Sequence, residues 1–298
     1  MDMPPFVTRG RRTALIRAVR IVSVMAAALL HGCGAQPRAG RDMTPETIRM
    51  KGSDTMRILA ERWAAAYMAQ PGAPVIYVEG GGTRSGVEAL IAGQVEICCA
   101  SRTLEAEEIQ RLWETYQSLG FKFLCAKDAL SIYLHPQNPV RDLSLHQLSA
   151  IMTGRISHWS EAGGEDRPIR VIIREPNSGT RAFIREHLLK GASYAAQAET
   201  IAGTRAVADT VAADPGAIGF GGLAYGPHVY HCRIEGVAPA EDAVRDGSYP
   251  IARYLYLYTV NRPRGDVKAF IDWVLSAPGQ RIVADVGYVP LWERPQPR

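Results

Sequence analysis

The 298-residue sequence lacks several features that mark common catalytic and metal-binding classes. It contains five cysteines, and none of them forms a CxxC pair or a metal-ligand spacing. No internal repeat is present, and no low-complexity block occurs outside the two termini. The remaining composition, 47% hydrophobic and 21% charged, is that of an ordinary globular protein. It suits one large domain or two modest ones.

The sequence near the N-terminus also lacks an apolar run long enough to span a membrane. "IVSVMAAALL", residues 21–30, is about half the length of a spanning helix, and it follows the basic segment "RGRRTALIRAVR". It ends in "LHGCG", which resembles the lipobox of bacterial lipoproteins, with His31 where a small or aliphatic residue is usual. We therefore predict a signal peptide over residues 1–32 and a lipid on Cys33. A cleaved signal without a lipid and a retained anchor are the alternatives.

The chain is close to neutral once the residues before Cys33 are set aside. Five arginines and one aspartate precede Cys33, so 29 of the 34 basic and 29 of the 30 acidic residues remain. The sequence therefore gives no reason to expect a nucleic-acid partner. Residues 33–47 are polar and rich in Gly and Pro, which predicts a flexible tether, and residues 293–298 are predicted to be a disordered tail.

Strand-like and helix-like segments alternate from Ile48 onward, which predicts an α/β fold with largely parallel sheets. Ser144 and Thr103 are predicted helix N-caps, Gly120 and Gly154 predicted helix ends, and Pro278 a helix break. The predicted strands are residues 47–53, 73–80, 96–100, 121–126, 130–136, 169–174, 217–225 and 254–260. The predicted helices are residues 54–69, 85–94, 103–120, 144–154, 179–191, 205–216 and 266–287, the last being one helix or two.

The cysteines after Cys33 lie in apolar surroundings. Cys98 and Cys99 are adjacent in a strand-like run and would point to opposite faces. Buried free thiols are the preferred interpretation, although an exported protein permits a disulfide, for instance with Cys125. His228 and His231 precede Cys232 without a further ligand pattern, so we expect no metal site.

Three junctions share a pattern in which a strand ends in Gly, Ser or Thr and a helix begins. They are "KGSDTM" with Ser53, Asp54 and Thr55, "GGGTRSG" with Thr83, and "REPNSGTR", residues 174–181. A helix N-terminus has unpaired N–H groups and the positive end of the helix dipole, so each junction can bind an anion. Simple helix capping is the alternative at each of them.

Other phosphate-binding and catalytic motifs fit poorly. "GGTRSG" has the glycine spacing of a P-loop, but Val87 and Glu88 follow it where Lys and Ser/Thr are needed. Ser178 does not stand in a GxSxG elbow, and His187 is better explained as a helix-face residue than as a catalytic base. Since no pair of acids has a general acid/base pattern either, we expect a binding protein, not an enzyme, and no cofactor.

The order of the motifs carries a more specific resemblance. "GSDT", "GGGTRSGVEALIAGQVEI", "SRTL", "LHQLSAIMTGRISHWSEAGG", "REPNSGTR", "AADPGAIGF" and "YPIARYLYLYTVN" follow one another along the chain. Together, over residues 48–291, they resemble the PstS-like phosphate-binding proteins of ABC transporters. The resemblance implies a two-lobed periplasmic-binding-protein fold of type II, each lobe a mixed sheet flanked by helices, with two crossovers acting as the hinge.

The resemblance further implies how the chain is divided and what it does. Lobe 1 would comprise residues 48–127 and 254–292, and lobe 2 residues 128–253, with hinges near Lys127-Asp128 and Ile251–Tyr254. The mature chain would be exported, would lie in the periplasm or at the cell surface, would be anchored to a membrane by its lipid, and would be monomeric. It would capture inorganic phosphate and deliver it to the permease of an ABC transporter.

The family's ligand-binding positions map onto this sequence one at a time. Thr55 and the amide of Met56 match the first anion-binding turn, with Ser53 and Asp54 beside them, and Thr83 matches a serine of the Gly-rich loop. The second lobe would contribute Arg174, Ser178, Gly179 and Thr180.

One position departs from the pattern of some relatives, which carry an aspartate where this chain has Arg102. Such an acid accepts a proton from hydrogen phosphate and rejects sulfate, which has no proton to give. Asp54 is the candidate substitute acceptor, with an N-cap role as its alternative. Arg102 either adds positive charge to the site or pairs with an acid such as Glu105. Sulfate, molybdate and tungstate are the alternative ligands, and a phosphatase is the less favoured alternative function.

Overall fold

The computed structural model describes residues 47–292. The predicted signal peptide, Cys33, nearly all of the tether and the C-terminal tail lie outside these residues. None of the helices between residues 47 and 292 has both the length and the apolar run that crossing a bilayer requires.

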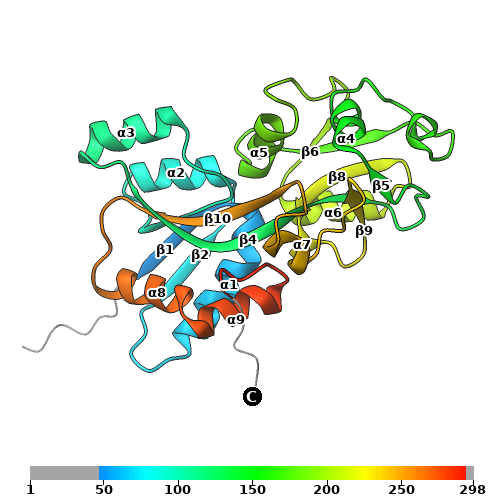
Figure 1. The fold of residues 1–298 in the computed structure, drawn as a ribbon. Helices are drawn as coiled ribbons and strands as arrows, with labels where there is room; N and C mark the ends of the chain where they lie inside the picture. The colour runs from blue at the N-terminus through cyan, green and yellow to red at the C-terminus, as the bar shows by residue number, and fades with distance from the viewer. Residues whose placement is uncertain (1–46, 293–298) are drawn as a thin grey trace, which may run out of the picture. The chain divides into compact units, whose positions relative to one another are not determined.

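A mixed ten-stranded sheet organises the described residues, with the strand order β2-β1-β3-β10-β4-β8-β6-β7 and with β9 and β5 attached beyond β4 (Figure 1). The first half contains β1 (Ile48–Gly52), β2 (Ile76–Glu79) and β3 (Ile97–Ala100). The second half contains β5 (Asp142–Leu143), β6 (Arg170–Arg174), β7 (Glu199–Ile201), β8 (Ala217–Gly222) and β9 (Tyr230–Ile234). β4 (Phe121–Leu134) and β10 (Ala252–Thr259) connect the two halves.

β4 and β10 correct two sequence-based expectations. The predicted strands 121–126 and 130–136 are one continuous strand, because residues 127–129 stay paired with β10, as in Asp128 opposite Arg253. The sheet is mixed and not largely parallel. β1 pairs in parallel with β2 and β3, and β6 with β7 and β8, but β10 is antiparallel to β3 and β4, and β4 is antiparallel to β8.

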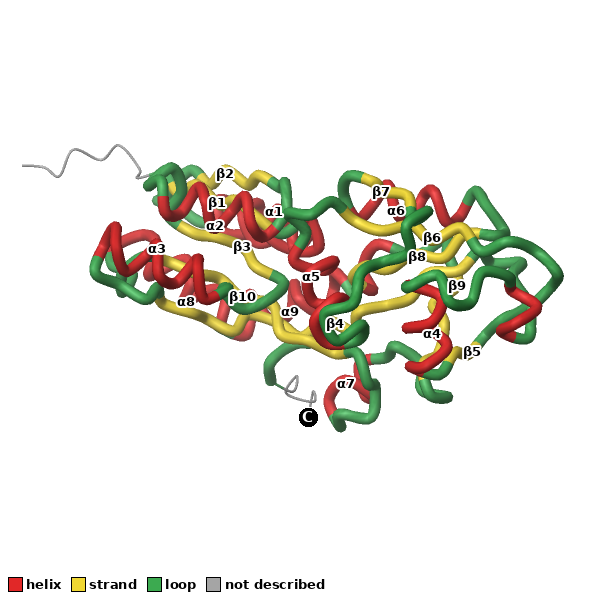
Figure 2. The backbone as a smooth tube through the Cα atoms, turned by 90° about the horizontal axis from the view of Figure 1, so that it is seen from above, coloured by secondary structure: helices red, strands yellow, loops and turns green. Residues whose placement is uncertain are grey.

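Helices cover both faces of the first half of the sheet (Figures 1 and 2). α2 (Thr83–Ile91) and α3 (Ala106–Tyr116) lie on one face, and α1 (Asp54–Met68), α8 (Gly265–Leu275) and α9 (Ala277–Val286) lie on the other. In the second half, α5 (Gly179–His187) contacts β6, α6 (Thr204–Ala212) packs on β8, and α4 (Leu145–Met152) and α7 (Glu241–Arg245) complete the shell.

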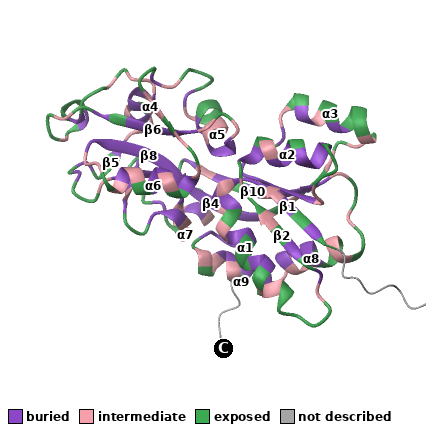
Figure 3. Cartoon of the chain, turned by 180° about the vertical axis from the view of Figure 1, so that it is seen from behind, coloured by how far each residue is buried: buried purple, intermediate pink, exposed green. Residues whose placement is uncertain are grey.

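Each half buries its own apolar core, and the buried segments concentrate on the strands (Figure 3). One large cluster of the first half includes Ile48, Leu59 and Trp63, and the large cluster of the second half includes Ile132, Trp159 and Phe220. Because apolar burial is the main favourable contribution to folding, two separate cores allow each half to hold its own shape.

The predicted helix boundaries are correct where the signal is local. Ser144 caps α4, with its hydroxyl accepting from the backbone N–H of Gln147, and Gly154 follows the helix at φ 79°. Thr103 is not the cap of α3. Glu105 is, because the Glu108 carboxylate accepts its N–H in a capping box. α3 ends before Gln117, which takes a left-handed φ of 54°, and not at Gly120.

The C-terminal helical segment forms two helices, α8 and α9, which meet at Ser276 with Pro278 in the first turn of α9. The prediction of buried free thiols is confirmed for the cysteines that the structure describes. Cys98, Cys99, Cys125 and Cys232 are all buried and unbridged. Burial raises the pKa of Cys99 to about 12, so this thiol stays protonated and unreactive near neutral pH.

Candidate functional site

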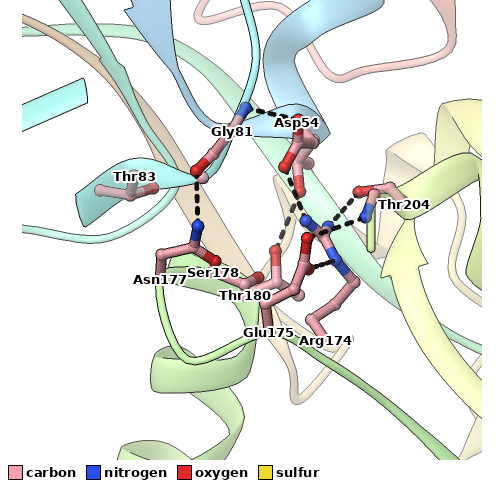
Figure 4. Close-up of polar contacts among 12 residues, drawn as sticks. Asp54, Gly81, Thr83, Arg174, Glu175, Asn177, Ser178, Thr180 and Thr204 are labelled. Carbon is pink, nitrogen blue, oxygen red and sulfur yellow. Dashed lines mark hydrogen bonds and ion pairs between the residues drawn. The ribbon is translucent and has the colours of Figure 1, made fainter. Parts of the chain in front are cut away.

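The three Ser/Thr/Gly junctions of the sequence converge where the two halves of the described chain meet (Figure 4). The β1–α1 turn carries Asp54 and Thr55, the β2–α2 turn carries Gly81 and Thr83, and the β6–α5 turn carries residues 174–180. The hydroxyl oxygens of Thr55 and Thr180 lie 2.9 Å apart across the junction. Side chains separated by 125 positions in sequence therefore share one buried polar centre.

The first turn buries Thr55 together with Ser53 and Met56. Thr55 is 1% exposed, and its carbonyl accepts a hydrogen bond from the Tyr288 hydroxyl, which fixes the start of α1. Ser53 occupies the N-cap position without a side-chain capping bond. The Met56 side chain belongs to the apolar core of the first half, and its N–H donates to the Ser53 carbonyl at 3.0 Å.

The second turn places Thr83 beside a serine that the sequence-based site did not include. The backbone N–H of Ser101 donates to the Thr83 hydroxyl oxygen at 3.2 Å, and the two hydroxyl oxygens lie 3.3 Å apart. Both residues are fully buried. Ser101 is the first residue of the quoted "SRTL" segment, so its place in a matched motif was the available signal.

Gly179 shows how closely the halves approach at this point. A Cβ added there would come within 2.7 Å of the Ser101 hydroxyl, and nearer still to that of Thr83. Glycine is therefore required by the close approach of the two turns. Ser178 caps α5, since its hydroxyl accepts a hydrogen bond from the Arg181 N–H at 3.3 Å. The capped N-terminus of α5 therefore lies at the polar centre.

Arg174 is the cation at the centre, and three of the five N–H donors of its guanidinium are used within the protein. It donates to the Asp54 carboxylate at 2.6 Å, to the Thr204 hydroxyl at 2.6 Å and to the Glu175 carboxylate at 2.8 Å. Its side chain is 2% exposed. A buried guanidinium surrounded by acceptors is held in one orientation, which suits planar recognition of an oxyanion.

Asp54 links the first turn to both other turns. One carboxylate oxygen accepts from Arg174 and the other accepts from the Gly81 N–H at 2.8 Å. The N-cap alternative for Asp54 is wrong, because α1 begins at Asp54 and the cap position is Ser53. A carboxylate has about four lone-pair sites, so two remain after these bonds.

Arg102 is directed toward α3. Its guanidinium makes two hydrogen bonds of 2.7 Å to the Glu108 carboxylate and lies 3.3 Å from Glu105. Of the two sequence-based interpretations, pairing with an acid is the one observed, and Glu108 is the closer partner. The Nε atom of Arg102 is buried and has no hydrogen-bond partner among the described residues.

A second buried arginine, Arg253, adjoins the centre from β10 and was missed by sequence reasoning. It forms an ion pair with Asp128 of β4 at 2.8 Å, with side-chain exposures of 2% and 0%. It also donates to the Ser101 carbonyl at 3.3 Å and contacts the Thr55 hydroxyl at 3.5 Å. Burial raises the pKa of Asp128, an effect that the Arg253 charge opposes.

Two cavities open on either side of this centre. One, of about 180 Å³, is lined by Arg84, Arg102, Glu105, Ser178, Arg181 and Arg185, together with Pro176 and Ala182. The other, of about 310 Å³, is lined by Asp54, Arg57, Glu61, Thr204, Arg205 and Tyr225, together with Ile58 and Gly203. Among residues 47–292, no cluster of three or more His, Cys, Asp or Glu side chains is arranged to hold a metal ion.

Comparison with known proteins places this chain in a family. A family model for the PBP superfamily domain matches residues 37–278. The phosphate-binding protein PstS of Bacillus subtilis is 31% identical over 259 residues, covering 85% of this chain and 83% of that protein. PstS of Pseudomonas aeruginosa is 28% identical over 263 residues, covering 80% of this chain and 81% of that protein.

Solved structures agree with the sequence relatives. A Clostridium perfringens protein crystallised with bound phosphate superimposes with a TM-score of 0.78 at 29% identity, covering 83% of this chain and 100% of that one. An ABC-type phosphate transport receptor from Vibrio cholerae gives a TM-score of 0.67 at 25% identity, covering 82% of this chain and 100% of that one. These matches confirm the predicted fold class, and the chain belongs to the PBP superfamily and, within it, to the family of the phosphate-binding proteins PstS.

Proposed function

We propose that the protein is an extracytoplasmic solute-binding protein that holds inorganic phosphate between its two halves and delivers it to the permease of an ABC transporter. The observation that carries this proposal is the meeting of hydroxyl and guanidinium donors from both halves at one buried centre. Relatives named phosphate-binding protein support phosphate as the ligand, and their names describe binding proteins, in agreement with the expectation that the chain is not an enzyme.

The proposed phosphate ligands are the donors around this centre. Arg174 supplies the positive charge, and Thr55, Thr83, Ser178 and Thr180 supply hydroxyl groups. The N-terminus of α5, at Gly179 and Thr180, adds backbone N–H groups and the positive end of the helix dipole. Hydrogen bonds to a charged ligand contribute roughly 1.5–3 kcal/mol each, so a few of them give selective binding.

Asp54 is proposed as the group that separates phosphate from sulfate. A site made only of donors accepts any tetrahedral oxyanion, whereas a carboxylate that can accept the proton of hydrogen phosphate repels fully ionised sulfate. Asp54 has two lone-pair sites beyond its bonds to Arg174 and Gly81, which is the capacity this role requires.

Domain movement is the second part of the proposal. We propose lobe 1 as residues 48–127 and 254–292 and lobe 2 as residues 128–253, with hinges at Lys127-Asp128 and Ile251–Tyr254. The two paired strands β4 and β10 carry both hinge segments, and each lobe has its own core, which are the features that hinge closure needs. Opening would separate Thr55 from Thr180 and Gly179 from Thr83, and it would admit the ligand.

The location of the protein completes the proposal. The basic and apolar leader, followed by Cys33, supports export and anchoring through a lipid on that cysteine, and we propose that the mature protein acts as a monomer. Mass spectrometry of the mature N-terminus would show the added lipid mass on Cys33 if the anchor exists.

Calorimetric titration of inorganic phosphate tests the central claim. We expect one tightly bound phosphate per chain, and Arg174→Ala should weaken it by at least about 1.5–3 kcal/mol because it removes donors to a charged ligand. Arg170→Ala is the matched control, since Arg170 lies on the same strand and pairs with Glu199 and Asp214 on the surface. Wild-type protein that shows no heat and no thermal shift with phosphate, sulfate or molybdate would disprove the proposal.

A further inference from the structure

The cavity beside Ser178 has a charge that the proposed phosphate site does not explain. Its lining includes four arginines, Arg84, Arg102, Arg181 and Arg185, and a single acid, Glu105. The cavity on the other side of the centre has two arginines and two acids among its lining residues. Even with Glu108 set against Arg102, one opening keeps an excess of positive charge, whereas the other is balanced.

The arginines of this basic cavity come from both halves of the molecule. Arg84 lies on α2 and Arg102 follows β3, whereas Arg181 and Arg185 lie on α5. A cavity of about 180 Å³ between them has room for a small tetrahedral anion. A larger open region of about 730 Å³ continues past Arg102 and Arg185 to Lys190, so the cavity is reached from outside the protein.

Several of these cations have unused capacity. Arg102 is 7% exposed, and its buried Nε has no hydrogen-bond partner among residues 47–292. Within the same residues Arg181 and Arg185 form no ion pair. Arg181 donates instead to the Arg174 carbonyl at 2.8 Å, and Arg185 is exposed in the last turn of α5. Arg84 and Arg102 share the one lining acid, Glu105, at 3.2 and 3.3 Å, and Arg102 is also paired with Glu108 at 2.7 Å.

We propose that this cavity is a second oxyanion subsite, which takes a phosphoryl group adjacent to the buried phosphate. A buried donor without a partner destabilises the protein, and an anion that accepts a hydrogen bond from it removes that penalty. Guanidinium forks match phosphoryl oxygens in geometry, and Arg84, Arg181 and Arg185 can offer such forks, whereas Arg102 offers only its Nε because Glu108 occupies its fork. Ser178 lines the cavity and also belongs to the proposed phosphate site, so the two positions adjoin.

The phosphoryl group can come from two sources that share this chemistry. It is either a second inorganic phosphate or the second phosphoryl of a diphosphate whose first phosphoryl enters the buried centre. Because Arg84 and Arg185 are exposed, binding at this subsite should weaken with salt more steeply than binding at the buried centre.

Calorimetric titrations of the full chain with inorganic phosphate and with pyrophosphate, at low ionic strength and in about 0.2 M NaCl, test the subsite. The test variant is Arg84→Gln with Arg185→Gln. The control is Arg111→Gln with Arg281→Gln, which removes two exposed arginines that line none of the cavities described above. Thermal unfolding shows whether each double variant is folded, and Arg185→Lys, which keeps the charge but loses the fork, serves as a milder second variant.

We expect a second, salt-sensitive binding event that weakens at least tenfold in the test variant and not in the control, with the first event unchanged. A second phosphate per chain identifies the free ion as the source. One pyrophosphate per chain that displaces phosphate, with an affinity that depends on Arg84 and Arg185, identifies the diphosphate. A single phosphate per chain, together with pyrophosphate binding that is absent or equal in both variants, overturns the proposal. Loss of the first event in wild-type protein would instead contradict the proposed phosphate function, so the two failures are distinguishable.

Discussion

Two arginine–aspartate pairs, one fully and one partly buried, lie within one small region of this protein, and they connect different parts of it. Arg174 and Asp54 join β6 to the start of α1, elements that belong to the two different halves. Arg253 and Asp128 join neighbouring residues of β10 and β4, which are directly opposite in the strand register. The first pair must separate if the halves move apart, whereas the second moves with the strands that connect them.

We call contacts between the two halves contacts of closure, and we call contacts between the strands that connect the halves contacts of the framework. Contacts of closure, including Arg174–Asp54, Thr55–Thr180 and Gly179 against Thr83, should control ligand binding with little effect on the free energy of unfolding. Contacts of the framework, including Arg253–Asp128, should control stability first. A closure variant that mainly lowers the free energy of unfolding, or a framework variant that mainly lowers ligand affinity, would show that this division is mistaken.

The largest effect is expected for Asp128→Asn, which leaves the Arg253 guanidinium buried without its counter-ion. Arginine cannot release its proton, so the free energy of unfolding should fall by about 3–5 kcal/mol, the usual cost of breaking a buried pair from one side. Urea unfolding followed by circular dichroism measures this change.

The double variant Asp128→Asn with Arg253→Met provides the control for that prediction. Removing both charges eliminates the unpaired guanidinium, so part of the lost stability should return. A double variant as unstable as the sum of its two single variants would mean that the pair is not coupled, and Arg253 would then have to be placed with the ligand contacts.

The next effect concerns Asp54, on the closure side of the comparison. Asp54→Asn removes a negative charge facing the proposed ligand, and the amide it introduces can donate. Sulfate should therefore bind more tightly by about 1.5–3 kcal/mol relative to phosphate, the range for a hydrogen bond to a charged group. Competition titrations at fixed pH measure the ratio, and Glu61→Gln, which removes an exposed acid of the adjoining cavity, is the control.

An unchanged ratio of phosphate to sulfate in Asp54→Asn would mean that Asp54 does not accept the proton of the ligand. Its role would then be limited to the bonds to Arg174 and Gly81 that the structure contains. A large loss of unfolding free energy in this variant would move the Arg174–Asp54 pair into the framework group.

Gly179→Ala tests closure by steric obstruction. The backbone of Gly179 has no positive φ, so the added methyl group causes no strain within its own turn, but it would clash with the hydroxyls of Thr83 and Ser101 across the junction. Overpacking of this kind costs about 1–3 kcal/mol, which should appear as roughly 5- to 150-fold weaker phosphate binding. Unfolding should stay nearly unchanged, because the obstruction disappears when the halves separate.

Small-angle X-ray scattering gives an independent measurement for the same variant. Phosphate should compact wild-type protein and should compact Gly179→Ala less at an equal ligand concentration. Full compaction with unchanged affinity would mean that the two turns do not have to meet for phosphate to bind.

The elements that flank the site could be predicted from sequence because their signals are local. Strand-to-helix junctions at Thr55, Thr83 and Ser178 are visible in short motifs. The Ser144 hydroxyl accepts a hydrogen bond from the N–H of Gln147, only three residues further along the chain. Glu105 displaced Thr103 as the cap of α3 because Glu108 pairs with Arg102 and also accepts the Glu105 N–H. The general preference for threonine at the N-cap position does not account for this capping box between Glu105 and Glu108.

Contacts between distant segments could not be predicted in the same way. Arg253 and Asp128 are 125 positions apart, and neither stands in a motif that indicates an ion pair. The continuity of β4 has the same origin, since the polar residues 127–128 are extended only because β10 pairs with them. Short strands such as β5 and β7 owe their form to their neighbours, and the sequence shows no periodicity over two or three residues.

The smallest expected effect lies within the framework of the second half, at His231 on β9. Its Nδ1 accepts from the Ser131 hydroxyl at 2.7 Å and its Nε2 donates to the Gly226 carbonyl at 2.8 Å, an arrangement of neutral imidazole.

Burial lowers the pKa of His231, so the unfolded chain binds the proton more readily than the folded protein does. The contribution to stability is complete above the unfolded pKa of about 6.5 and is lost as the pH falls through the folded pKa, at no more than about 1.4 kcal/mol per pH unit. Urea unfolding between pH 7.5 and 5 should show that His231→Gln loses less stability on acidification than wild type, with phosphate affinity at pH 7.5 unchanged. Equal pH dependence in the two proteins would assign the titration to another group, whereas a change in affinity would place β9 among the parts that move on closure.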